Sequence, residues 1–240
     1  MEPLHIFLLV AVGIGAGFVQ RVSGFGLGIF SMLFLPYFIP SHTAAAISCL
    51  FSVGTSTYNA IRYRKNINFK TVLPLILAAA VSIPIAVYFS VHVPKRIFEI
   101  LLGSVLIALS IYFVFFNKRI KFHPTPLGGV VAGAVGGTLN GLFSTGGPPV
   151  VLYLSHAAEN NAVYFATIQF YFCFTNIYAT ATRAINGVVT REVLLYGVIG
   201  FAGCMLGDLI GRSVFDKLDG DKLKLIIYVG MIVSGIIMIF

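Results

Sequence analysis

The chain has 240 residues, of which 58% are hydrophobic and only 10% are charged, and its mean hydropathy is +0.95. A soluble domain carries about 25% charged residues, so this composition excludes an ordinary soluble protein and predicts one embedded in lipid. The net charge of +8 then indicates basic cytoplasmic loops and contact with the lipid bilayer, and we expect no nucleic-acid partner.

Apolar segments follow one another along most of the chain. They cover residues 4–20, 27–39, 43–61, 72–91 and 97–116 in the first half, and 127–143, 150–157, 162–182, 193–210 and 223–240 in the second. Most approach the length of about 20 residues that spans a bilayer as a helix. The second and seventh are shorter and are expected to be half-helices or re-entrant arms. We therefore predict an all-α integral membrane protein with roughly 8–10 membrane segments.

The first apolar run begins almost at the N-terminus, and no Lys or Arg precedes it. A cleaved signal peptide has a basic region there, so we expect this run to remain as a transmembrane segment. The expected location is the plasma membrane, which is the inner membrane if the source is a Gram-negative bacterium. The protein is expected to cross it several times.

The order of one long, one short and three long segments occurs twice, which predicts an internal duplication. A shift of 121 residues places Ser23 on Ser144 and Arg62 on Arg183. We therefore divide the chain into a first membrane repeat over 1–117, a cytoplasmic connector over 118–126 and a second membrane repeat over 127–240. Inverting the second repeat places more Lys and Arg on the cytoplasmic side than a parallel arrangement does, so we expect two five-segment inverted repeats.

Two polar, glycine-rich stretches interrupt the apolar pattern at matching places in the halves. They are Ser23-Gly24-Phe25-Gly26-Leu27-Gly28 and Ser144-Thr145-Gly146-Gly147-Pro148-Pro149. Glycine costs a helix about 1 kcal/mol and proline about 3 kcal/mol, so the helices must break there. Inside a membrane such a break survives only when it is buried in protein or faces a wet cavity. Matching breaks in two halves are typical of a transport site near the bilayer midplane.

The helices that start after the two breaks favour an anion as the ligand. Near Leu27 and Val150, positive N-terminal ends and unpaired amides would point toward the shared site. The hydroxyl groups of Ser23, Ser144 and Thr145 add further donors. Three cysteines, Cys49, Cys173 and Cys204, lie in apolar runs without C-x-x-C spacing and are expected to be core residues. We expect no metal site and no cofactor, since no His or carboxylate cluster has ligand spacing.

At these residues the chain resembles the TauE/SafE family, also called the sulfite exporter or 4-toluene sulfonate uptake permease family. The resemblance rests on the glycine-rich stretch 24–28, on the alanine-rich stretch 44–48 and on Gly141-Leu142-Phe143-Ser144-Thr145-Gly146-Gly147-Pro148. It covers essentially the whole chain. It implies a secondary transporter whose partner is a small anionic sulfur-containing solute, such as sulfite, sulfoacetate or another organosulfonate. A homo-oligomer is a possible assembly.

The candidate substrate contacts are the residues of the two breaks and polar residues on neighbouring segments. They are Gln20, Arg21, Ser23, Gly24, Phe25, Gly26, Asn59, Asn140, Ser144, Thr145, Gly146, Gly147, Gln169 and Asn176. Arg21 is the expected cation for the anion, because an intramembrane Arg costs about 2.5 kcal/mol or more and forms two bonds with an oxyanion. The alternative is that Arg21 ends the first segment at a membrane face and reaches lipid headgroups.

The other polar residues have two interpretations each. Gln20 and Asn140 either contact the substrate or bond between helices. Arg62 and Arg183 either belong to a polar lining, since they share a helix face with Asn59 and Asn176 respectively, or anchor their helix ends at the membrane interface. Asp208 either relays protons as a coupling group or forms a local ion pair with Arg212, four residues later.

Two other functional classes remain open. An anion channel on the same frame is the nearer one, because backbone dipoles also form selectivity filters. A membrane-embedded enzyme would need a nucleophile with a base or a metal cluster, and no Ser/His/Asp or Cys/His arrangement is evident in the sequence. We therefore predict a transporter and no enzymatic activity.

Overall fold

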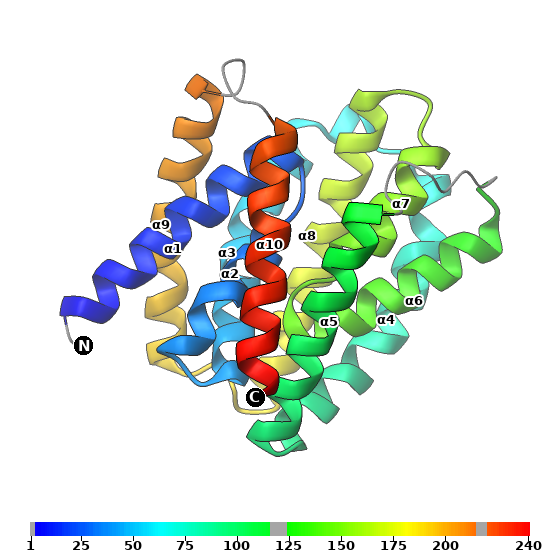
Figure 1. Cartoon of the computed structure of the whole chain (residues 1–240). Helices are drawn as coiled ribbons and strands as arrows, with labels where there is room; N and C mark the ends of the chain where they lie inside the picture. Colours follow the sequence, from blue (N-terminus) through cyan, green and yellow to red (C-terminus); the bar gives the residue numbers. More distant parts are fainter. Residues whose placement is uncertain (1–2, 116–123, 215–219) are drawn as a thin grey trace.

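The computed structural model describes residues 3–115, 124–214 and 220–240, and within them the chain is helical with no strand. Most of the connector expected over 118–126 lies outside these residues. The helices are α1 Pro3–Ser23, α2 Leu27–Phe34, α3 Ser41–Arg62, α4 Phe69–His92, α5 Lys95–Phe115, α6 Pro126–Phe143, α7 Gly147–Ala157, α8 Asn161–Ile185, α9 Arg191–Val214 and α10 Gly220–Ile239. Short 3-10 turns follow α2 (η1, Leu35–Tyr37) and α3 (η2, Arg64–Asn66). Figure 1 shows the bundle.

Five of the described helices, namely α1, α4, α5, α6 and α9, are long and apolar enough to cross a bilayer. The helices that follow the two breaks are short, with 8 residues in α2 and 11 in α7. Large apolar side chains stay exposed along one side of α4, at positions 73, 77, 81, 85 and 88. This spacing places them on one helix face, which therefore suits contact with lipid. The prediction of an all-α membrane protein is confirmed.

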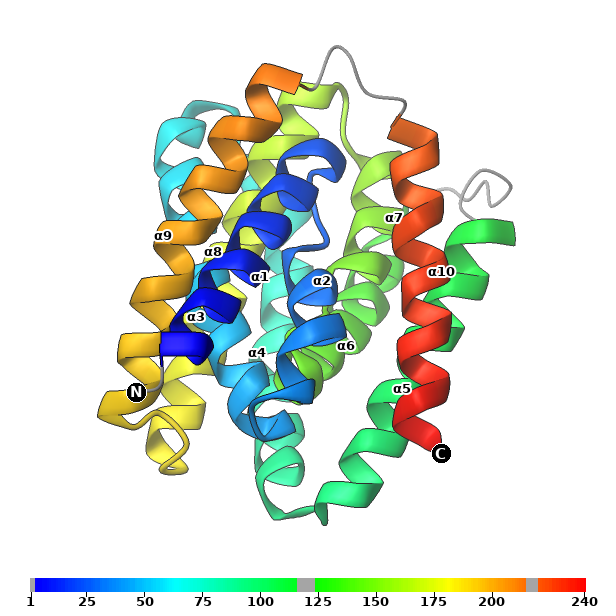
Figure 2. The same cartoon turned by 60° about the vertical axis from the view of Figure 1, so that its left-hand side comes forward.

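The pairs of helices that pack together recur with an offset of five helices. α1 packs along α9 as α6 packs along α4, and α3 contacts α9 as α8 contacts α4. The remaining large contacts join α3 to α8 and α5 to α10, which are counterparts of one another. In Figures 1 and 2, α5 and α10 lie side by side and run in opposite directions. Two five-helix units related by a two-fold axis would pack in this way, while their inversion across a membrane stays a prediction.

Glycines bring the largest helix pairs into close contact. A Cβ on Gly17 of α1 would overlap the backbone of Cys204 on α9, and a Cβ on Gly207 would overlap that of Ile14. On the other side of the bundle, Gly137 of α6 meets Ala79 of α4 in the same way. Since lipid provides no hydrophobic force between helices, this close backbone packing is what stabilises the pairs.

We expect Gly207→Val to destabilise the protein, because its side chain must push α9 away from Ile14 on α1. Overpacking of this kind costs about 1–3 kcal/mol, and thermal unfolding of the purified protein would measure it. Ala202→Val is the matched control, since Ala202 lies on the same helix and is exposed. Equal melting temperatures for the two variants would contradict the close contact.

The placement of basic residues predicts which end of the bundle faces the cytoplasm. η2, with Arg64 and Lys65, and the start of α9 at Arg191 lie at opposite ends of the molecule (Figure 2). We expect a cysteine at Lys65 to resist an impermeant thiol reagent in intact cells, and a cysteine at Arg191 to react. The parent protein is the control, because its cysteines are buried or half-buried. Labelling of both positions from outside would contradict the inverted arrangement.

Candidate functional site

Both predicted breaks are present, and each contains backbone in a left-handed conformation. Between α1 and α2, Gly24 and Gly26 have φ of 77° and 104°. Between α6 and α7, Ser144 has φ of 60°, and it is the one non-glycine residue with positive φ among those described. Backbone of this kind costs about 1–3 kcal/mol in a residue with a side chain and is concentrated at functional sites.

The two breaks touch each other in the middle of the bundle. Gly28, in the first turn of α2, packs so closely on the Ser144 carbonyl that a Cβ there would overlap its oxygen. The ring of Phe25 lies beside Gly147, at the start of α7. The start of α2 is therefore fixed against the end of α6, although the two are more than 100 residues apart in sequence.

A small cavity lies where the breaks meet. Its lining comes from both breaks and from α3 and α8, and consists of Gln20, Gly26, Leu27, Gly28, Ile29, Ser52, Thr55, Ser56, Asn140, Ser144, Thr145, Gly146, Gly147, Phe172 and Asn176. The cavity volume is about 30 Å³. One water needs roughly 10–15 Å³ on this measure, so the space holds about two waters or one small ion.

Two buried donors at this cavity have no partner within the described part of the chain. They are the amide Nδ2 of Asn140 and the hydroxyl Oγ1 of Thr145, whose residues are 4% and 2% exposed. An unpaired buried polar group costs about 1–3 kcal/mol, so native proteins keep few of them. A ligand that accepts hydrogen bonds would remove this cost at both positions.

Arg183 lies directly behind the cavity wall and is only 1% exposed. Its Nη2 donates to the carbonyls of Asn140 (3.1 Å) and Gly141 (2.8 Å), near the end of α6. Its Nη1 donates to Sγ of Cys49 at 2.9 Å. No ion pair joins it to a carboxylate among the described residues. The guanidinium therefore adds a buried positive charge beside the cavity.

Cys49 connects Arg183 to two residues of the cavity lining. Its sulfur accepts a hydrogen bond from Oγ of Ser144 at 3.3 Å, and its thiol donates to Oδ1 of Asn176 at 3.6 Å. Cys49 is fully buried. The network holds Ser144 in its left-handed conformation and fixes the direction of the Asn176 amide.

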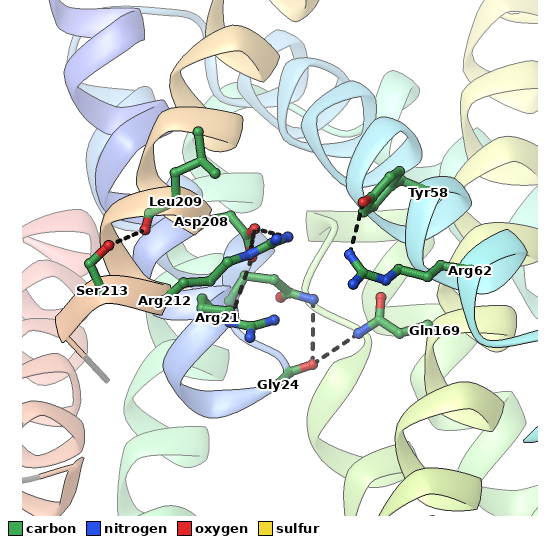
Figure 3. A network of polar contacts seen from close by, with 10 residues as sticks. Arg21, Gly24, Tyr58, Arg62, Gln169, Asp208, Leu209, Arg212 and Ser213 are labelled. Atoms are coloured by element: carbon green, nitrogen blue, oxygen red, sulfur yellow. Dashed lines mark hydrogen bonds and ion pairs between the residues drawn. The ribbon is translucent and has the colours of Figure 1, made fainter. Parts of the chain in front are cut away.

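Two glutamines stabilise the first break. Gln20 accepts from the backbone N–H of Leu27 (3.3 Å) and donates to the Gly24 carbonyl (3.4 Å). Gln169 donates to the same carbonyl at 3.3 Å, as Figure 3 shows. The Leu27 amide was one of the donors expected for the anion. It already has a partner, so side-chain donors become more important at this end of the cavity.

Several predicted site residues lie outside the cavity lining. Arg21 is 4.0 Å from Asp208, which is held by Arg212 at 2.6 Å (Figure 3). Asn59 and Asp208 line a second, smaller cavity next to the first. The side chain of Ser23 lies outside the described residues. The substrate roles of all these residues, and the coupling role of Asp208, stay predictions.

The interface role expected for two arginines fits only one of them. Arg62 is exposed and donates to the Tyr58 hydroxyl at 3.0 Å, as an interfacial anchor would. Arg183, its counterpart after the 121-residue shift, is buried instead. Residues of α3 that the sequence interpretation did not select, Ser52 and Ser56, also line the cavity. Their four-residue spacing within an apolar helix was a signal that they share one face.

Comparison with known proteins identifies the family. The family described as "Sulfite exporter TauE/SafE" matches residues 9–238 of the chain, nearly its whole length. The chain belongs to the TauE/SafE family. The protein is therefore a member of a membrane-transporter family and a multi-pass protein of the plasma membrane, as the sequence predicts.

A curated relative agrees with this TauE/SafE assignment. It is the "Probable sulfite/organosulfonate exporter TauE" of Cupriavidus necator, 23% identical over 212 residues, which cover 83% of this chain and 80% of the relative. No solved structure matches the chain.

We expect Arg183→Met to lower the stability of this TauE/SafE protein. The Gly141 carbonyl would lose its Arg183 donor in a buried place, and an unpaired buried group costs about 1–3 kcal/mol. The Asn140 carbonyl would also lose Arg183 but would keep its bond from the Ser144 N–H. The melting temperature of the purified protein should fall by roughly 5 °C or more. Arg62→Met is the control, since Arg62 is exposed and should change little. An Arg183→Met protein as stable as the control would show that the guanidinium does not hold the end of α6.

Proposed function

We propose that the protein is a secondary transporter that moves a small sulfur-containing anion, such as sulfite or an organosulfonate, through the central cavity. The observation that carries this proposal is the combination of unpartnered donors and a buried cation at the contact of the two breaks. Asn140 and Thr145 offer the donors, and Arg183 offers the charge. The family and its curated relative support the substrate class.

Electrostatics favour an anion over a neutral or cationic solute. A charged group away from water is costly unless an opposite charge or several hydrogen bonds compensate it. Arg183 has three hydrogen bonds but no counter-charge among the described residues. An anion in the adjacent cavity would supply that charge. In a low dielectric the attraction is stronger than at a surface.

The donors suit the oxygens of a sulfite or sulfonate group. We assign the amide of Asn140 and the hydroxyl of Thr145 to direct contact with these oxygens, and Gly146 and Gly147 to their close approach. Ser144 and Asn176 keep the site in shape through Cys49. The tight volume favours a compact oxyanion such as sulfite, and a longer organosulfonate would require the site to widen.

Alternating access agrees with the way the helices pack. The repeated contacts α1–α9 and α6–α4 indicate two similar units, with the cavity between their breaks. Rocking of one unit against the other would expose the cavity to each side in turn. An anion channel is the alternative mechanism. In proteoliposomes a carrier gives saturable uptake that is accelerated by substrate inside the vesicle, whereas a channel gives no such acceleration.

The sharpest test is Thr145→Val, which removes a buried hydroxyl without changing the size of the side chain. Because this hydroxyl has no partner within the described chain, the melting temperature should stay the same or rise slightly. Sulfite transport should fall by about 10- to 100-fold in kcat/KM, since a hydrogen bond to a charged group is worth about 1.5–3 kcal/mol.

Thr180→Val is the matched control for this experiment. The Thr180 hydroxyl is also buried and has no partner within the described chain, but Thr180 does not line the cavity. Its removal should leave sulfite transport unchanged. Normal transport by Thr145→Val, or equal losses in both variants, would contradict the proposed site.

A further inference from the structure

Three arginines and one carboxylate lie at the end of the bundle where α1, α3 and α9 finish. We propose that Arg21, Arg62 and Arg212 form a second, outer anion site that collects the substrate oxyanion and passes it to the central cavity. The site takes a small oxyanion from the aqueous phase. It rests on the proposed function only for the identity of the transported anion.

The positive charge at this cluster exceeds the negative charge. Asp208 accepts from Nε of Arg212 at 2.8 Å and pairs with Nη2 of the same residue at 2.6 Å. Arg21 lies 4.0 Å from the same carboxylate. Arg62 forms no ion pair among the described residues and donates to the Tyr58 hydroxyl at 3.0 Å. Its guanidinium also lies 6.0 Å and 5.7 Å from the ring centres of Tyr58 and Tyr63, which are neutral partners. One carboxylate therefore serves two guanidinium groups, and the third has no counter-charge.

In Figure 3 the side chains of Arg62, on α3, and Arg212, on α9, extend toward one another from opposite sides of the view. Asp208 balances the charge of Arg212, and an oxyanion between the two guanidinium groups would supply the counter-charge that Arg62 lacks. Arginine suits an oxyanion because its planar group can donate two parallel hydrogen bonds. Tyr58, whose hydroxyl accepts from Arg62, adds a further polar group.

A second small cavity lies between this cluster and the central cavity. It is lined by Gly17, Gln20, Thr55, Tyr58, Asn59, Met205 and Asp208. Two of these residues, Gln20 and Thr55, also line the central cavity. The two spaces therefore adjoin at this pair, and in the proposed path a change of rotamer at Gln20 opens a route between them. An anion held at the cluster would then be next to its path inward.

The cluster is partly open to water, as an access site requires. The side chains of Arg21 and Arg212 are each 35% exposed, and that of Asp208 is 22% exposed. Charges in such a place raise the local concentration of an oppositely charged solute, and salt weakens the effect. The outer site should therefore act on the apparent affinity for substrate rather than on the turnover number.

The experiment measures initial rates of sulfite uptake by proteoliposomes made of phosphatidylcholine alone. Arg62→Gln should raise the KM for sulfite roughly 3- to 10-fold, leave kcat unchanged, and weaken the dependence of KM on salt. Arg62→Lys keeps the charge and should retain most of the salt dependence. Arg64→Gln is the matched control, because Arg64 is exposed two residues away and donates only to the Ile61 carbonyl.

Two outcomes would overturn the outer site. One is an unchanged KM and salt dependence in Arg62→Gln, or the same changes in Arg64→Gln. The other is a KM effect that appears only when phosphatidylglycerol is added, since the cluster would then bind lipid headgroups rather than free anions. Thr145→Val tests the central site separately. If Arg62→Gln is normal while Thr145→Val is defective, the proposed function stands and the outer site fails.

Discussion

The arrangement of the site depends on how Arg183 closes the end of α6. A helix that stops inside a membrane leaves carbonyls without partners, and lipid cannot supply any. Arg183 donates to the Gly141 carbonyl and, together with the Ser144 N–H, to the Asn140 carbonyl. It also donates to Cys49, whose sulfur accepts a hydrogen bond from the Ser144 hydroxyl. One side chain thus adds donors at the end of the helix that the glycines and prolines interrupt, supports the left-handed residue that follows, and places a positive charge beside the cavity.

Neutral side chains stabilise the first break, whereas a charged side chain stabilises the second. Neutral glutamines, Gln20 and Gln169, share the Gly24 carbonyl, while the exposed Arg62 takes no part. Two halves that pack alike therefore differ at the place where they meet. The cavity has a charged wall on the α6 side and a neutral, polar wall on the α1 side, so a bound oxyanion would lie in an asymmetric field.

Much of the architecture could be read from the sequence, because glycine and proline inside an apolar run interrupt a helix wherever it lies. That rule located both breaks and, with them, cavity-lining residues such as Asn140 and Thr145. The same rule could not predict that Arg183 is buried beside the cavity. The sequence places Arg183 near a helix end, where arginines commonly reach water. Its burial depends on the packing of α8 against α3 and α6. The direction in which α1 presents Arg21 depends on its contact with α9, which sequence spacing does not define.

The glycine contacts determine which parts of the protein can shift against each other. Where the backbone of α9 rests on that of α1, and α6 on α4, no layer of side chains remains to slide or repack. Gly103 and Gly235 bring the backbones of α5 and α10 together in the same way. Each of these three pairs is therefore a stiff unit, and a rocking motion would have to deform the bundle at side-chain contacts such as those of α3 with α8. The bundle can therefore yield most easily where α3 and α8 meet, next to the central cavity that both helices line.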